Sequence, residues 1–161
     1  MKKWILWISL ALLLGGCGGE ETFETVADEA VLPVMANPRQ ITVRLPQDMA
    51  EPMTGSNGEQ IYVCEDHEII IETLASGDLN GTFRRICGYE KEDLTVMQTQ
   101  WDAVSRYDFV WAVTGEEGDR LGRAVILDDG QYHYCMSILE DAGSENDGPA
   151  WETVFSSFGL T

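Results

Sequence analysis

The sequence predicts an α+β fold, in which an antiparallel β-sheet of about six to seven strands is flanked by helices. Two observations carry this prediction. Between residues 41 and 139, short segments of strand-like pattern follow one another, and hairpin-type turns join most of them. Two other segments, around residue 83 and near residue 155, repeat their apolar residues at helical spacing.

The first strands follow from three runs of apolar and β-branched residues. Residues 41–45 alternate between apolar and polar side chains and stop at Pro46. Residues 61–64 and 68–74 are rich in isoleucine, valine and tyrosine, which favour strands. The intervening residues 65–67 suit a turn, so we expect a short strand followed by a hairpin.

Residues 79–87 predict a helix, because their apolar side chains share one face and two arginines lie outside it. The apolar face consists of Leu79, Phe83, Ile86 and Cys87. Gly88 suits the position directly after the helix, where many helices end in a residue of left-handed backbone conformation. Residues 94–99 then return to a strand pattern.

The second half of the sheet has the strongest signals. Residues 107–114 carry large apolar side chains at every second position, and residues 123–127 and 131–139 flank the turn signal Asp128-Asp129-Gly130. A final helix is expected to begin near Pro149. Its apolar stripe consists of Trp151, Val154, Phe155 and Phe158.

The N-terminal segment has the features of a secretory signal. Lys2 and Lys3 precede an apolar run that is too short to cross a bilayer as a helix. The following Leu14-Gly15-Gly16-Cys17 resembles the lipobox of bacterial lipoprotein precursors. That resemblance implies removal of residues 1–16 and attachment of lipid to Cys17, so we expect an extracytoplasmic protein held at the cell membrane by its acyl chains.

Residues 17–38 read as an acidic tether, and residues 39–161 as the globular domain. The tether interpretation rests on its glycines, prolines and carboxylates, and packing of part of it on the domain is an open alternative. The chain has 28 acidic and 10 basic side chains, a formal charge of −18. This charge excludes nucleic acid as a partner, because the phosphate backbone would be repelled.

The order of the elements resembles the PsbP/Mog1 superfamily over residues 39–160. The resemblance rests on a strand ending at Leu45-Pro46, a hairpin, a helix, a long antiparallel meander and a last helix closing on Phe155-Ser156-Ser157-Phe158. Lipid-anchored members of this kind occur in Gram-positive gut bacteria. The resemblance implies an α/β/α sandwich that serves as an accessory or binding module without a shared catalytic centre.

Catalytic chemistry has little support in the sequence. The chain contains no GxSxG, HExxH, Walker or GxGxxG motif, and its two histidines, His67 and His133, have no partner at a telling spacing. We therefore predict no enzymatic activity and no cofactor. The alternative is an extracytoplasmic enzyme in which Cys64 and His133 meet as nucleophile and base.

Three cysteines remain besides Cys17, namely Cys64, Cys87 and Cys135, at spacings too wide for a redox or zinc motif. They are interpreted as small apolar core residues, with one disulfide and one thiol as the alternative. We predict no metal site. Residues 76–81 resemble the start of an EF-hand loop, but Cys87 stands where a bidentate glutamate is needed, so a helix N-cap at Ser76 or Asp78 is favoured.

Two minority possibilities stay open. The acidic segment 140–148 would make the domain a calcium-binding surface module if its carboxylates held a cation. Large aromatic side chains, if exposed around a groove, would form a binding platform. The candidates are Trp101, Trp111, Tyr132, Tyr134, Trp151 and Phe155. The sequence thus predicts a cell-envelope lipoprotein with a non-catalytic binding or accessory role, whose partner is an envelope protein or a small ligand.

Overall fold

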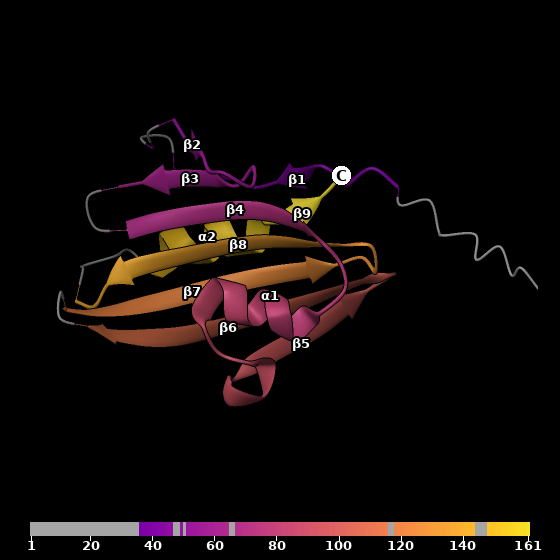
Figure 1. Cartoon of the computed structure of the whole chain (residues 1–161). Helices are drawn as coiled ribbons and strands as arrows, with labels where there is room; N and C mark the ends of the chain where they lie inside the picture. Colours follow the sequence, from indigo (N-terminus) through magenta and orange to yellow (C-terminus); the bar gives the residue numbers. More distant parts are fainter. Residues whose placement is uncertain (1–35, 47–48, 50, 65–66, 116–117, 144–147) are drawn as a thin grey trace, which may run out of the picture. The chain divides into compact units, whose positions relative to one another are not determined.

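The central element is a seven-stranded antiparallel sheet with strand order β2-β3-β4-β8-β7-β6-β5, seen face-on in Figure 1. The computed structural model describes residues 36–46, 49, 51–64, 67–115, 118–143 and 148–161. The signal segment 1–16, Cys17 and most of the predicted tether lie outside these ranges. The strands of the sheet are β2 (Met53–Thr54), β3 (Gln60–Val63), β4 (His67–Ala75), β5 (Val96–Trp101), β6 (Val104–Gly115), β7 (Gly118–Asp128) and β8 (Tyr132–Asp141).

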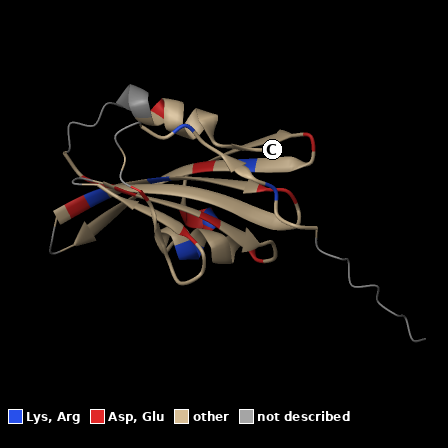
Figure 2. Ribbon diagram, turned by 90° about the horizontal axis from the view of Figure 1, so that it is seen from above, with Lys and Arg blue, Asp and Glu red and all other residues tan. Residues whose placement is uncertain are grey.

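Two helices cover opposite faces of this sheet, as the edge-on view in Figure 2 shows. They are α1 (Leu79–Cys87) and α2 (Gly148–Ser157), and a short 3-10 turn, η1 (Lys91–Asp93), follows α1. The predicted α+β class with a sheet flanked by helices is therefore confirmed. None of the helices in the described ranges is long and apolar enough to span a bilayer.

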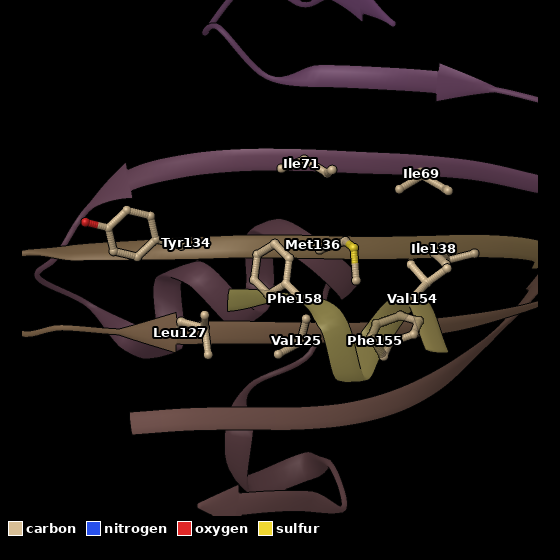
Figure 3. Close-up of a cluster of buried hydrophobic side chains, with 10 residues drawn as sticks. All are labelled: Ile69, Ile71, Val125, Leu127, Tyr134, Met136, Ile138, Val154, Phe155 and Phe158. Carbon is tan, nitrogen blue, oxygen red and sulfur yellow. The ribbon is translucent and has the colours of Figure 1, made fainter. Parts of the chain in front are cut away.

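The face under α2 carries the larger hydrophobic core. Phe155 and Phe158 at the end of the chain pack against buried residues of β4, β7 and β8 (Figure 3). The buried members are Ile69, Ile71, Val125, Leu127, Tyr134, Met136, Ile138, Val154, Phe155 and Phe158. The seven members from the strands occupy alternate positions along β4, β7 and β8, because successive side chains of a strand point to opposite faces.

The face under α1 holds the second core. Phe83 of α1 lies 4.5 Å from Phe109, measured between ring centroids, and both are buried with Tyr107 and Trp111 of β6. The helix ends as predicted, because Gly88 takes a left-handed conformation with φ of 83° and donates its N–H to Arg84 O.

The expected strand at 41–45 is shorter than predicted. Only Ile41 and Thr42 form a strand, β1 (Ile41–Thr42), which pairs with β9 (Gly159–Leu160) in a separate two-stranded sheet. Val43 and Leu45 leave the ladder but still pack on the α2-side core. Neither β9 nor β2 was predicted, because two-residue strands leave no periodicity to detect.

Residues immediately before β1 contact the domain. The Ala36 N–H donates to the Gln131 side chain at 3.0 Å, and the Arg39 N–H donates to the Tyr134 hydroxyl at 2.9 Å. The last part of the segment predicted as tether, residues 36–38, thus lies against the folded body. His67, which was expected in a turn, is the first residue of β4.

Candidate functional site

The proposed nucleophile–base pair is not assembled. Cys64 follows β3, and its N–H donates to His67 O, at one end of β4. His133 of β8 pairs with Leu74, at the other end of the same strand. His67 and Leu74 are seven residues apart, which separates them by roughly 24 Å at ~3.4 Å per residue. The enzyme alternative that needs Cys64 beside His133 therefore has no geometric basis.

His133 instead belongs to a buried polar cluster between α1 and the sheet. Its Nδ1 lies 2.7 Å from Thr82 Oγ1, and its Nε2 lies 3.4 Å from Ser76 Oγ and 3.8 Å from Asp128 Oδ2. Burial lowers the pKa of His133, against the opposing effect of nearby Asp128.

This cluster contains a serine, a histidine and an aspartate but does not have the arrangement of a catalytic triad. In a triad the carboxylate and the nucleophile sit on opposite ring nitrogens, whereas here Asp128 and Ser76 share Nε2. The imidazole is also only 1% exposed. The cluster is suited to fastening α1 to β7 and β8.

The EF-hand-like segment 76–81 is a helix start. Because α1 begins at Leu79, Asn80 and Gly81 lie within the helix. Asp78 occupies the N-cap position, as predicted, although its side chain makes no capping hydrogen bond and accepts one from Arg84 instead. Among the described residues, no group of three or more His, Cys, Asp or Glu side chains is placed to hold a metal ion. Residues 144–147 of the acidic segment lie outside the described ranges.

The cysteines differ in exposure. Cys135 is buried beneath α1, where burial raises the pKa of its thiol well above the ordinary value. Cys87 is half-buried, and burial also raises its pKa. Both carry free thiols. Cys64 is half-buried after β3. The interpretation of Cys135 as a core residue is confirmed.

Four exposed apolar side chains lie on the α2 side of the sheet, beyond the part that the helix covers. Four residues form this α2-side surface, which are Met97, Trp101, Val110 and Leu121, with exposures of 62%, 84%, 60% and 48%. Register shows that they share a face with the core under α2, since Val110 pairs with Arg123 and Arg123 with Ile138. Val110 lies diagonally between Met97 and Leu121, whereas Thr99 and the Arg106–Asp108 ion pair separate Trp101 from them.

A cavity of about 160 Å³ continues this surface toward α2. Its walls are Leu121, Arg123, Ile138, Glu140, Trp151 and Phe155. The Arg123 guanidinium lies 4.2 Å from the centroid of the Phe155 ring, so its charge is held over an aromatic face. Trp151 packs edge-on against His67 at 4.8 Å between ring centroids.

The size of this cavity indicates what it accepts. Pockets for drug-sized molecules and cofactors measure about 300–1,000 Å³, so a cavity of about 160 Å³ has room only for a single side chain or a group of similar size. Arg123 and Glu140 place one positive and one negative group at its wall. The cavity therefore has room for one side chain beside a positive and a negative group.

A second cavity, of about 490 Å³, lies between residues 42–44 and the end of α2. Its lining is rich in hydroxyl groups, and several of them are already engaged. Ser156 Oγ donates to Thr153 O, and Ser157 Oγ donates to Val154 O and accepts from the Arg44 N–H. Ligand pockets are mostly apolar with a few convergent polar groups, so this hollow is the weaker candidate.

The aromatic side chains divide by exposure. Trp111, Tyr134 and Phe155 are buried, as core residues should be, and Tyr132 and Trp151 are half-buried. Trp101 is the exception, because 84% of it is exposed. From the sequence, each of these aromatic residues was a candidate for a binding platform. Which of them face solvent depends on which strands the helices cover.

The chain matches no protein-family model and no curated protein.

Proposed function

We propose that this protein is a cell-envelope lipoprotein whose folded domain binds a partner protein through its α2-side surface and catalyses no reaction. Cys17 would carry the lipid, and residues 18–35 would connect the anchor to the domain. This arrangement agrees with the positive n-region, the short apolar run and the lipobox. The resemblance to the PsbP/Mog1 superfamily, whose members serve as accessory or binding modules, supports the same role.

The observation that carries the binding role is the exposed apolar surface beside a cavity of side-chain size. Met97, Val110 and Leu121 are each about half exposed or more, in a chain with a formal charge of −18. Leaving such side chains in water has no benefit for stability, since burying them would stabilise the fold. A partner that covers them would gain that free energy on binding.

Anchoring is tested with Cys17→Ala in a lipidating bacterial host. We expect the wild-type chain in the membrane fraction, with a mature mass that lacks residues 1–16 and includes the added acyl groups. The variant should keep its precursor mass. Normal processing and membrane recovery of Cys17→Ala would contradict the lipoprotein assignment.

Binding is tested by placing a photo-cross-linking amino acid at Leu121 in the native host. A matched control carries the same amino acid at Val63, an apolar residue of similar exposure (53%) on the α1 side of the sheet. We expect one dominant protein adduct at position 121 and none at position 63. Equal adduct patterns at both positions, or none at either, would refute binding through the α2-side surface.

A further inference from the structure

The strand β5 is an open edge of the main sheet. It pairs with β6 along one side, in an unbroken register from Val96–Phe109 to Trp101–Val104. It ends the strand order, so within the described part of the chain no strand lies along its other side. Every second residue of an edge strand directs its backbone N–H and C=O away from the sheet.

This edge lacks the usual protection against pairing with another chain. Natural edge strands are blunted by lysines, prolines, bulges or inward-pointing charges. The six residues of β5, Val-Met-Gln-Thr-Gln-Trp, include no charged residue and no proline. Their continuous register with β6 also leaves no bulge. The strand is therefore ready to accept a further strand.

The side chains of β5 also favour binding at this edge. Met97 and Trp101 are among the most exposed apolar residues of the domain, and both lie on the α2 side. Tryptophan is enriched among the residues that dominate binding energy at interfaces. A strand added beside β5 would place alternate side chains against Met97 and Trp101 and so continue the α2-side surface.

The acidic residues around β5 indicate which kind of partner segment would bind there. The neutral strand is bordered by exposed carboxylates, Glu92 and Asp93 before it and Asp102 after it. Lys91 lies at the first of these ends, where its Nζ donates to Gln98 Oε1 at 3.3 Å, so three acids face one base around the strand. Residues 36–161 contain 23 acidic and 8 basic side chains, so the domain attracts cationic segments. Several of the basic side chains are already paired with acids of the same domain, among them Arg84, Arg85 and Arg106.

The same charges disfavour a second copy of this chain as the occupant. In an antiparallel pair of β5 strands, the Asp102 end of each copy lies beside the acidic end of the other, and a register centred on Met97 would place Asp102 opposite Glu92. Like charges so close are unfavourable across an interface.

We propose that β5 is a docking edge for an extended segment of a partner protein, neutral at its centre and carrying lysine or arginine at its ends. The segment would join the sheet as a further strand by main-chain hydrogen bonds. This inference rests on the proposed function, because the segment would belong to the partner that covers the α2-side surface.

The test measures binding of a labelled peptide to the full chain in detergent by fluorescence anisotropy. The probe is a heptapeptide of alternating valine and threonine with a lysine at each end. Two analogues carry N-methyl groups on alternate backbone amides, one on the odd-numbered amides and the other on the even-numbered amides. A third analogue has glutamates in place of the two lysines. We expect one N-methylated analogue and the glutamate analogue each to bind at least about tenfold more weakly.

On the protein side, Thr99→Lys places a protective charge on the edge, and Thr114→Lys places the same charge on β6, away from it. We expect Thr99→Lys to weaken binding at least about tenfold and Thr114→Lys to change it less than about twofold. Thermal unfolding of both variants checks that each is folded.

Two results would overturn the inference. One is binding that neither N-methylated analogue nor Thr99→Lys weakens. The other is a dimer of the wild-type chain, seen by light scattering, that Thr99→Lys dissociates, since β5 would then serve a second copy. If the adduct at position 121 still forms in either case, the proposed function stands and only the edge docking fails; if it is also missing, both fail.

Discussion

The hydroxyl oxygen of Thr82 lies 2.7 Å from Nδ1 of His133, and this contact joins α1 to β8 inside the protein. Both side chains are buried, so neither is solvated if its partner is removed. We expect Thr82→Val to lower the free energy of unfolding by about 1–3 kcal/mol, because it leaves a buried ring nitrogen unsatisfied. Urea unfolding followed by circular dichroism measures this. Thr82→Ser keeps the hydroxyl and should cost less, so equal losses for both variants would contradict the prediction.

We also expect His133 to make the stability of the fold depend on pH. Burial lowers the pKa of His133 in the folded protein, and the nearby carboxylates of Asp128, Asp129 and Asp78 oppose this only in part. As the pH falls through about 6.5, the unfolded chain binds a proton that the folded chain takes up only at lower pH. The free energy of unfolding should therefore decrease from about pH 7.5 toward pH 5.

The control for this pH dependence is His133→Gln, which lacks the titrating group but shares every other carboxylate and base. Urea unfolding of both proteins across the same pH series gives their difference. We expect the advantage of the wild-type protein to shrink as the pH falls. A difference that stays constant or grows toward low pH would show that His133 is not the group responsible.

Much of the fold was predictable because its signals are local. The helix over 79–87 has an amphipathic pattern and a terminating Gly88, and the structure has it at the same bounds. The turn between β5 and β6 was not predicted, since Asp102 and Ala103 include no glycine. Asp102 nevertheless adopts a positive φ of 53° there, which extends β5 to Trp101.

The candidate site was much less predictable. Strand register, which no local pattern specifies, separates Cys64 from His133, and the packing of α1 on the sheet brings Thr82 to His133 instead. The exposure of Val110 and Leu121 depends on where α2 ends its cover of the sheet. In sequence, Val110 is an ordinary position of the predicted strand 107–114, and Leu121 lies just before the predicted strand 123–127. Only the assembled sheet shows that both are exposed strand residues.

Gly122 is required by the indole of Trp111. The two residues pair across β6 and β7, and a Cβ at position 122 would overlap the Trp111 ring. We expect Gly122→Ala to lower the free energy of unfolding by about 1–3 kcal/mol, because the buried indole would have to leave its packed position. Gly115→Ala is the matched control, since its added methyl would meet only Gly118 O at 3.8 Å. Equal midpoints of thermal unfolding for the two variants would count against a packing role for Gly122.

Arg106 secures the C-terminal end of α2 to the sheet. Its guanidinium donates to Phe155 O at 2.9 Å and to Phe158 O at 3.2 Å, and it forms an ion pair with Asp108 at 2.7 Å. Arg106→Met would leave these carbonyls and a mostly buried carboxylate without their donor, so we expect a loss of about 2–4 kcal/mol in the free energy of unfolding.

The matched control is Arg84→Met, which removes an exposed arginine whose ion pairs with Asp78 and Glu90 lie in solvent. Exposed pairs contribute little, so this variant should stay within about 0.5 kcal/mol of the wild-type protein. Urea unfolding, followed by tryptophan fluorescence, compares the two. If both variants lost the same stability, the helix would be held by its apolar face alone. A larger loss for Arg106→Met would show that the guanidinium helps to hold α2, and with it the wall that Phe155 contributes to the cavity, in place.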